Sequence, residues 1–226
     1  MTLLQISTVA DTATVSTGDA SVNLFDLLLK GGYVMIPLLL LSIAAIAIFI
    51  ERMLTIRKSD KSPKGLLDQV KSLVASANIN EARALCAQNE APIARMLEKG
   101  ISRIGSPLKN IEVAIENVGK IEIYRLEKNL STLATISGAA PMIGFLGTVT
   151  GMIQAFIAIA QEEGSVSPKL LSEGIYEAMI TTAVGLAVGI IAYLGYNYLV
   201  TQVQKVIHKM EYTSVEFIDL LQEPKG

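Results

Sequence analysis

Three long stretches of the chain carry no charged side chain, and each is strongly apolar. They cover residues 33–50, 129–161 and 178–204. At about 1.5 Å of rise per helical residue, each stretch is long enough to cross a hydrocarbon core about 30 Å thick. No stretch alternates apolar and polar residues with a period of two, which argues against a membrane β-barrel. The pattern therefore predicts three transmembrane helices.

The polar residues between the spans have helical spacing with few breaks. Ser106 followed by Pro107 is a typical helix start, with the serine expected as the N-cap. The next proline is Pro141, so we expect one helix from about residue 107 into the second span, kinked near that proline. The third span has no stop signal and keeps an amphipathic pattern to about residue 222. Two spans should thus extend far into the cytoplasm.

Near the N-terminus, Val22, Phe25, Leu28 and Leu29 fall on one helical face. This spacing predicts a short amphipathic helix on the outer face of the membrane that the chain spans. A simple helical lead-in to the first span fits equally well. The predicted segments, in chain order, are a flexible outer tail (1–21), an amphipathic surface helix (22–32), the first span (33–51), a cytoplasmic helical domain (52–132), the second span (133–160), a short outer loop (161–173), the third span (174–200) and a cytoplasmic C-terminal helix (201–226).

Composition and charge agree with a membrane protein and indicate its orientation. Hydrophobic residues make up 51% of the chain and charged residues only 18%, which is too apolar for a soluble domain. Of 19 Lys and Arg residues, 14 lie within 51–132 and 3 follow residue 200, so the positive-inside rule places both regions in the cytoplasm. A net charge of −2 gives no reason to expect a nucleic-acid partner. The single cysteine, Cys86, allows no disulfide within one chain.

Small residues form a stripe along each of the last two spans. In span two these are Ala140, Gly144, Gly147, Gly151, Ala155 and Ala158, and in span three they are Gly174, Ala178, Thr181, Gly185, Gly189 and Ala192. Both sets follow the same helical spacing, so each lies on one face. Such stripes allow close helix packing, either within one chain or between copies of it.

Polar side chains in these spans are the candidate functional residues. Thr148 and Thr182 lie beside the stripes, and we interpret them as the polar wall of a lumen; hydroxyl bonds within each helix are the alternative. Glu177, at the outer end of span three, is either a carboxylate at a pore entrance or a solvated residue at a helix start. No acid lies at mid-depth, so a proton pathway would need one from another chain. We interpret His208 as a surface residue.

Other chemistry finds no support in the sequence. No nucleotide-binding fingerprint, nucleophile elbow or HExxH motif occurs, and no pair of catalytic groups is expected to converge. We therefore expect a protein that is not an enzyme and has neither a cofactor nor a metal site.

The membrane segments resemble a known family. The stretches GGYVMIPLLLLSIAAIAIFIER, AAPMIGFLGTVTGMIQAF and EAMITTAVGLAVGIIAYLGYN are similar to the three membrane signatures of the ExbB/TolQ/MotA proton-channel family, and the chain is most similar to ExbB. The resemblance implies a ring of five copies in the bacterial inner membrane, with the N-terminus periplasmic and the C-terminus cytoplasmic. It also implies an ExbD-like partner whose single span bears an aspartate, a TonB-like protein that receives the work, and contact with membrane lipids.

The resemblance assigns roles to individual residues. Thr148 and Thr182 fall on the family's lumen-lining threonines, and Glu177 falls on its acid in span three. Thr181 stands where a small apolar residue is often found, which leaves open whether Thr181 or Thr182 faces the lumen. A TolQ-like or gliding or secretion motor subunit is the alternative within the family. Outside it, a structural membrane scaffold or a secondary transporter remains as an alternative.

Overall fold

The structure is a computed structural model, and it describes residues 32–60, 65–161 and 168–222. Every secondary-structure element in these ranges is an α-helix. The predicted outer tail (1–21) and nearly all of the predicted amphipathic helix (22–32) lie outside the described residues, as do residues 162–167 of the predicted outer loop.

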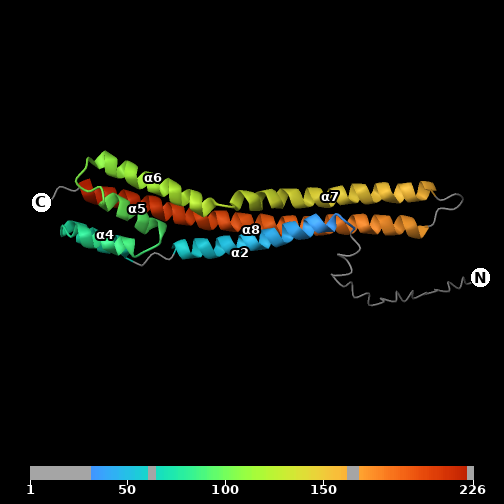
Figure 1. The fold of residues 1–226 in the computed structure, drawn as a ribbon, viewed down its shortest axis with the longest axis horizontal. Coiled ribbons are helices and arrows are strands. Elements are labelled where there is room, and N and C mark those ends of the chain that lie inside the picture. The colour runs from blue at the N-terminus through green and yellow to red at the C-terminus, as the bar shows by residue number, and fades with distance from the viewer. Residues whose placement is uncertain (1–31, 61–64, 162–167, 223–226) are drawn as a thin grey trace, which may run out of the picture.

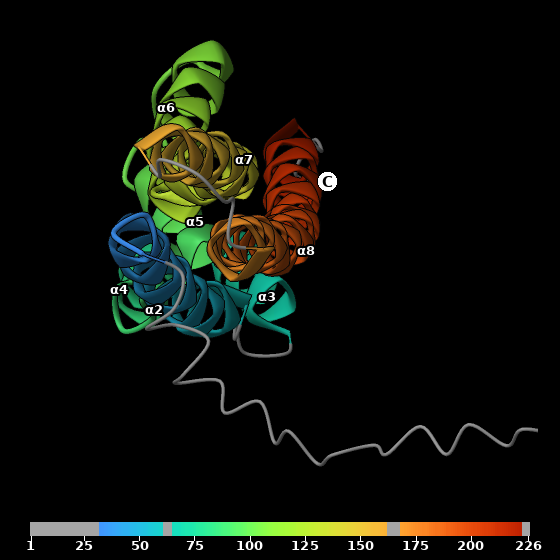
Figure 2. The same cartoon turned by 90° about the vertical axis from the view of Figure 1, so that its right-hand side faces the viewer.

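Three helices are long and apolar enough to cross a membrane, as predicted. The first is α2 (Met35–Asp60), the second is α7 (Leu130–Gln161) and the third lies within α8 (Pro168–Gln222). Figure 1 shows α7 and α8 side by side at one end of an elongated molecule, with α2 along the middle of α8. In the end-on view of Figure 2, these three helices form the corners of a triangle. The expected all-α membrane fold is therefore confirmed.

The 55 residues of α8 form one uninterrupted helix that ends at Gln222. At the usual rise this rod is about 80 Å long. A membrane span needs only about 20 residues, so more than half of α8 extends beyond the span. The long C-terminal rod is as the sequence predicts.

The continuous helix predicted from about residue 107 is interrupted. It consists of α6 (Leu108–Glu127) and α7, separated at Lys128, whose ψ is 135°, and Asn129, whose φ is 62°. Asparagine tolerates this left-handed conformation better than most residues, because its short side chain bonds locally to the backbone. Nothing in the apolar spacing signals the break, and the prediction of one helix was wrong at these two residues.

The expected cap of α6 is also different. Pro107 occupies the N-cap position, and the hydroxyl of Ser106 donates to the carbonyl of Arg103 over 2.7 Å rather than to the first turn of α6. The ring of Pro107 still restricts its own φ, here −51°, and thereby limits the conformations of the chain at the start of the helix. The start of α6 is thus one residue later than predicted.

The end of the molecule at which α8 terminates has an apolar core built around the last turns of α8. Four helices pack there, namely α3 (Leu66–Ala75), α4 (Ile79–Ala87), α5 (Pro92–Ile101) and α6. Phe217 of α8 and Ile115 of α6 are fully buried. Both lie so close to Gly100 of α5 that an added Cβ would be only 2.8 and 2.7 Å from them. This core holds α6 and the last turns of α8 together and thereby fixes the direction in which α7 and α8 leave it.

Candidate proton pathway

The small-residue stripes of α7 and α8 face each other within one chain. A Cβ added at Gly185 would lie 2.8 Å from the Cα of Gly144 and 2.7 Å from the carbonyl oxygen of Ala140. A Cβ added at Gly151 would lie 3.1 Å from the Cβ of Ala178. Real Cβ atoms essentially never lie within 3.0 Å of a backbone atom, so Gly185 sets the closest approach of the two helices, and a side chain at Gly151 would also be tightly packed.

Pro141 belongs to the same contact. α7 continues through this proline, whose missing N–H leaves the carbonyl of Ser137 without its usual helical partner. Gly189 of α8 lies against both the Pro141 ring and that carbonyl, since an added Cβ would be 2.5 Å from the ring and 3.0 Å from the oxygen. A glycine is needed at this position because any side chain would displace the proline.

Two threonine hydroxyls bridge the helices next to these glycines. The hydroxyl of Thr182 donates to the carbonyl of Gly144 over 3.1 Å, and that of Thr148 donates to the carbonyl of Ala178 over 3.2 Å. The two hydroxyl oxygens are also in direct contact. Each hydroxyl has one proton and two lone pairs, so the two cannot make all three bonds at once. The pair can exchange donor and acceptor roles, as a chain of hydrogen bonds that passes a proton must do.

The adjacent Thr181 lies in a different environment. Its side chain is only 2% exposed, and its hydroxyl donates to the carbonyl of Ala178 over 2.8 Å. It packs on Gly147, where an added Cβ would lie 2.5 Å from its Oγ1. Thr148 and Thr182 are both partly exposed. Of the two adjacent threonines, Thr181 is therefore the one enclosed between α7 and α8 of the same chain.

Glu177 lies one turn beyond the threonines toward the outer end of α8. Its partly buried side chain lies against Gly32, which has a left-handed φ of 65° and comes just before α2. A side chain at position 32 would occupy the space of the Glu177 carboxylate. The chain entering α2 thus covers part of the Glu177 carboxylate, an acid that lies near the threonine pair.

A second polar cluster, which the sequence analysis did not identify, lies beside the break between α6 and α7. Glu122 of α6 is 5% exposed and accepts hydrogen bonds from Arg95 over 3.0 Å and from Arg125 over 2.6 Å. Arg52 of α2 is equally buried and donates to the carbonyl of Arg125 over 3.2 Å. That carbonyl lies in the last turn of α6, where backbone acceptors lack helical partners. Arg52 therefore ties the first span to α6 beside the break that precedes α7.

One signal could have identified this cluster. Glu122 occupies the apolar face of α6 with Ile111, Ile115, Gly119 and Leu126. A carboxylate at a core position of a helix requires charged partners. For metal binding, by contrast, no three His, Cys, Asp or Glu side chains cluster anywhere in 32–60, 65–161 or 168–222.

Comparison with known proteins places this arrangement in a family. The model of the MotA/TolQ/ExbB proton channel family matches residues 88–212, more than half of the chain. The chain belongs to this family. The matched segment contains all the threonines and glycines of the α7–α8 contact, whereas α2 lies outside it. With three helices able to span a membrane, this MotA/TolQ/ExbB family protein is a multi-pass membrane protein, and the resemblance predicted from its motifs is confirmed.

Curated relatives carry names from the same family. A "Putative biopolymer transport protein ExbB-like 1" from Synechocystis sp. is 36% identical over 187 residues, which is 79% of this chain and 71% of the relative. A "Putative biopolymer transport protein ExbB homolog" from Methanothermobacter thermautotrophicus is 31% identical over 175 residues, covering 75% of this chain and 62% of its own length, less than two thirds. A "Tol-Pal system protein TolQ" from Haemophilus influenzae is 38% identical over 85 residues, 38% of this chain and 37% of the relative.

Proposed function

We propose that this chain is the proton-channel subunit of an energy-transducing complex in the bacterial inner membrane. In this proposal several copies, five by analogy with the family, form a ring that encloses the span of an ExbD-like partner. Protons that move inward titrate an aspartate of the partner, and the work reaches a TonB-like protein. One charge that crosses about 100 mV releases about 2.3 kcal/mol, so several protons are needed for one mechanical step.

The observation that carries the proposal is the contact between the Thr148 and Thr182 hydroxyls in spans that contain no acid at mid-depth. Hydroxyls can relay a hydrogen bond but do not store a proton at neutral pH. The titrating group must then come from another polypeptide, and an aspartate facing these threonines would complete the path. Glu177, near the outer end of the same helix, is proposed to admit protons from the periplasmic side.

The proposed orientation follows the charge distribution. The first basic residues after span one are Arg52, Arg57 and Lys58, within two turns of the membrane. Basic residues this close to a span favour the cytoplasmic side. The N-terminus and the loop after α7 are then periplasmic, and the α8 rod is cytoplasmic.

A TolQ-like role is the second candidate. The TolQ of Haemophilus influenzae shares 38% identity with the chain, although over 85 residues only. The two ExbB-named relatives described above match about twice as many residues, which favours an ExbB-like role.

Reconstitution tests the proposal. The chain is purified with and without a co-expressed single-span protein that carries one intramembrane aspartate, and proton flux into liposomes is measured under a potential. We expect flux only with the partner, and loss of flux when its aspartate is replaced by asparagine. Flux through this chain alone would contradict the proposal. A complex that never conducts would support a scaffold, and solute-coupled flux would support a transporter.

A further inference from the structure

Two cavities adjoin each other along the seam between α2 and α8. One has a volume of about 300 Å³ and is almost wholly apolar, with Ala45, Ile46 and Phe49 of α2 and Ile191 and Leu194 of α8 in its wall. The other has a volume of about 270 Å³ and has a charged rim. Tyr198 of α8 lines both cavities, so they adjoin at this residue, and the two together are called the groove.

The two cavities lie at different depths. Along α2, Phe49 is in the last turn of the first span, and Arg57 follows eight residues later, about 12 Å further along the axis. The headgroup layer on each side of a bilayer is about 5–8 Å thick, and long basic side chains reach back toward it. The apolar cavity therefore lies at the depth of acyl chains, and the charged cavity lies at the depth of phosphate groups.

The side chains around the charged cavity favour the binding of an anion. Its wall contains Arg57, Lys205 and Lys209 against a single acid, Asp60, with which Lys209 forms an ion pair of 2.5 Å. With His208 neutral, the sum is +2. Arg57 and Lys205 are both exposed, and no carboxylate among the described residues pairs with either.

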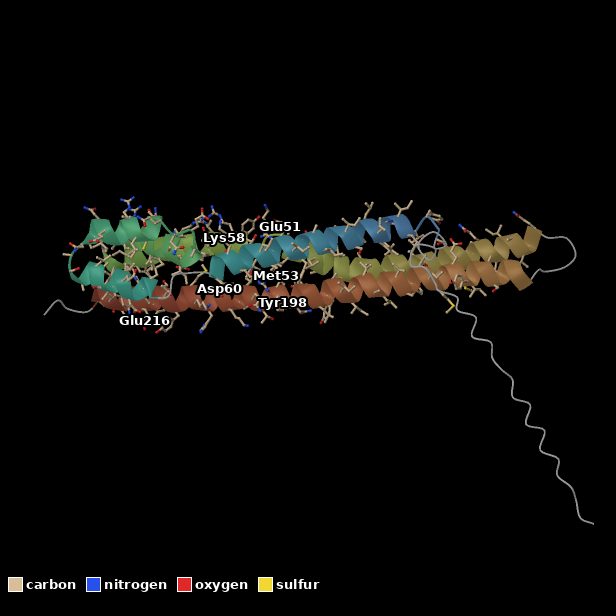
Figure 3. All side chains as sticks on the ribbon, turned by 90° about the horizontal axis from the view of Figure 1, so that it is seen from below. Glu51, Met53, Lys58, Asp60, Tyr198 and Glu216 are labelled. Atoms are coloured by element: carbon tan, nitrogen blue, oxygen red, sulfur yellow. The ribbon has the colours of Figure 1, made fainter. Side chains whose placement is uncertain are left out.

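Tyr198 stands at the boundary between the two cavities. Its ring lies against that of Phe49, with centroids 6.4 Å apart. Tyrosine is enriched at this level of membrane proteins because its ring is apolar and its hydroxyl is polar. Figure 3 shows Met53 and Asp60 of α2 on the side facing Tyr198, whereas Glu51 and Lys58 lie along the opposite edge of the helix.

We propose that this groove binds one anionic phospholipid of the cytoplasmic leaflet. Its phosphate lies among Arg57, Lys205 and Lys209, and one acyl chain lies in the apolar cavity beyond Tyr198. A lipid accounts for both halves of the groove, whereas an acidic peptide would match only the charged half. The bound lipid would bridge the first span and the α8 rod where the two leave the membrane.

A tryptophan reporter tests the proposal. The sequence contains no tryptophan, so Phe49→Trp places a single fluorophore in the wall of the apolar cavity. The purified full-length protein is reconstituted in bilayers that contain brominated phosphatidylglycerol or brominated phosphatidylcholine with the same chains, and quenching gives the relative association. We expect phosphatidylglycerol to be preferred by about fivefold or more, the effect of one basic residue near an anionic surface.

Charge variants identify the groove. Arg57→Gln with Lys205→Gln should bring the preference close to one. The matched control, Lys58→Gln with Lys109→Gln, also removes two positive charges, but from sites outside the groove. It should keep the preference for phosphatidylglycerol. Equal quenching by both lipids, or an equal loss in the control, would overturn the proposal. Leu194→Trp, on an exposed side chain of the same cavity, provides a second reporter.

Soluble glycerol phosphate distinguishes a lipid from a free phosphate ester. It lacks the chain that fills the apolar cavity, so millimolar amounts should leave the lipid preference unchanged. If they abolish it, the charged cavity binds phosphate esters alone and the assignment to a lipid is wrong.

Discussion

The hydroxyl of Thr148 on α7 contacts the hydroxyl of Thr182 on α8, and both lie beside the carbonyl of Gly144. Three possible hydrogen bonds, to the carbonyls of Gly144 and Ala178 and between the two hydroxyls, thus compete for two hydroxyl protons. The contact depends on Gly144 and Gly185, because a methyl group at either position would move the helices apart.

We predict that replacing both threonines by alanine abolishes proton flux in the reconstituted complex while assembly persists. Loss of a proton-transfer group lowers a rate by about a hundredfold or more. Thr150→Ala is the matched control, because the Thr150 hydroxyl bonds only to carbonyls of its own helix, at 3.0 and 3.1 Å. Flux is measured with a pH-sensitive dye, and assembly by size-exclusion chromatography. Normal flux in the double variant would show that the two threonines are not part of the proton pathway.

A methyl group at Gly185 should destabilise the contact between α7 and α8. In Gly185→Ala the new Cβ would lie 2.8 Å from the Cα of Gly144, and neither backbone can yield without moving a helix. Overpacking of this kind costs about 1–3 kcal/mol. Gly138→Ala is the control, since nothing lies within 4 Å of the added Cβ, and it should be neutral or slightly stabilising. Thermal unfolding in detergent compares the two variants, and equal midpoints would contradict the packing argument.

Glu177→Gln should reduce proton flux without loss of assembly, because a carboxamide at the outer end of α8 can neither bind nor release a proton. Glu211→Gln is a control on the same helix, since Glu211 is exposed in the part of α8 beyond the membrane span. Flux is measured in the same liposome assay. A fully active Glu177→Gln variant would show that Glu177 is only a solvated residue at the start of the helix.

Replacement of Glu122 by glutamine should lower the stability of the helices α3 to α6 that pack on the end of α8. The change removes the carboxylate that accepts from Arg95 and Arg125. A hydrogen bond to a charged group contributes about 1.5–3 kcal/mol, and because both arginines are partly exposed, we expect a loss near the lower end of this range. Glu112→Gln breaks an exposed pair with Lys109 and should change the stability by less than about 0.5 kcal/mol.

The buried Cys86 thiol provides the measurement for this comparison. It is the single cysteine of the chain, and burial raises the pKa of Cys86 to about 11. The folded protein should thus react slowly with maleimide at pH 8, and the reaction should report the opening of the apolar core around the last turns of α8. If the two glutamine variants react at equal rates, Glu122 does not stabilise this part of the fold.

The ion pair between Lys71 of α3 and Glu216 of α8 predicts a pH dependence. The two groups are 2.5 Å apart; Lys71 lowers the pKa of Glu216, and Glu216 raises the pKa of Lys71. A lowered acid pKa stabilises the fold above the unfolded value of 4.5, and this stability is lost as the pH falls through the lower folded pKa. The raised Lys71 pKa stabilises the fold below the unfolded value of 10.5, and this stability is lost as the pH rises through the folded pKa.

Glu216→Gln should therefore be less stable than the unmodified protein near neutral pH, and the two should converge in strong acid. Unfolding midpoints between pH 3 and 8 measure this difference. A constant difference across that range would show that the ion pair does not cause it.

The sequence alone determined the three spans, the long α8 rod and the two small-residue stripes, because these depend on residue type and helical period. It also brought Thr148, Thr182 and Glu177 forward as candidates, since polar groups are rare in apolar helices. Only the tertiary structure decided that Thr181 is enclosed, that Thr148 and Thr182 meet, and that Asn129 interrupts the helix before span two. Adjacent residues on one helix, such as Thr181 and Thr182, point in different directions. Which of them is enclosed therefore depends on how α7 packs against α8, and the helical spacing alone does not determine this packing.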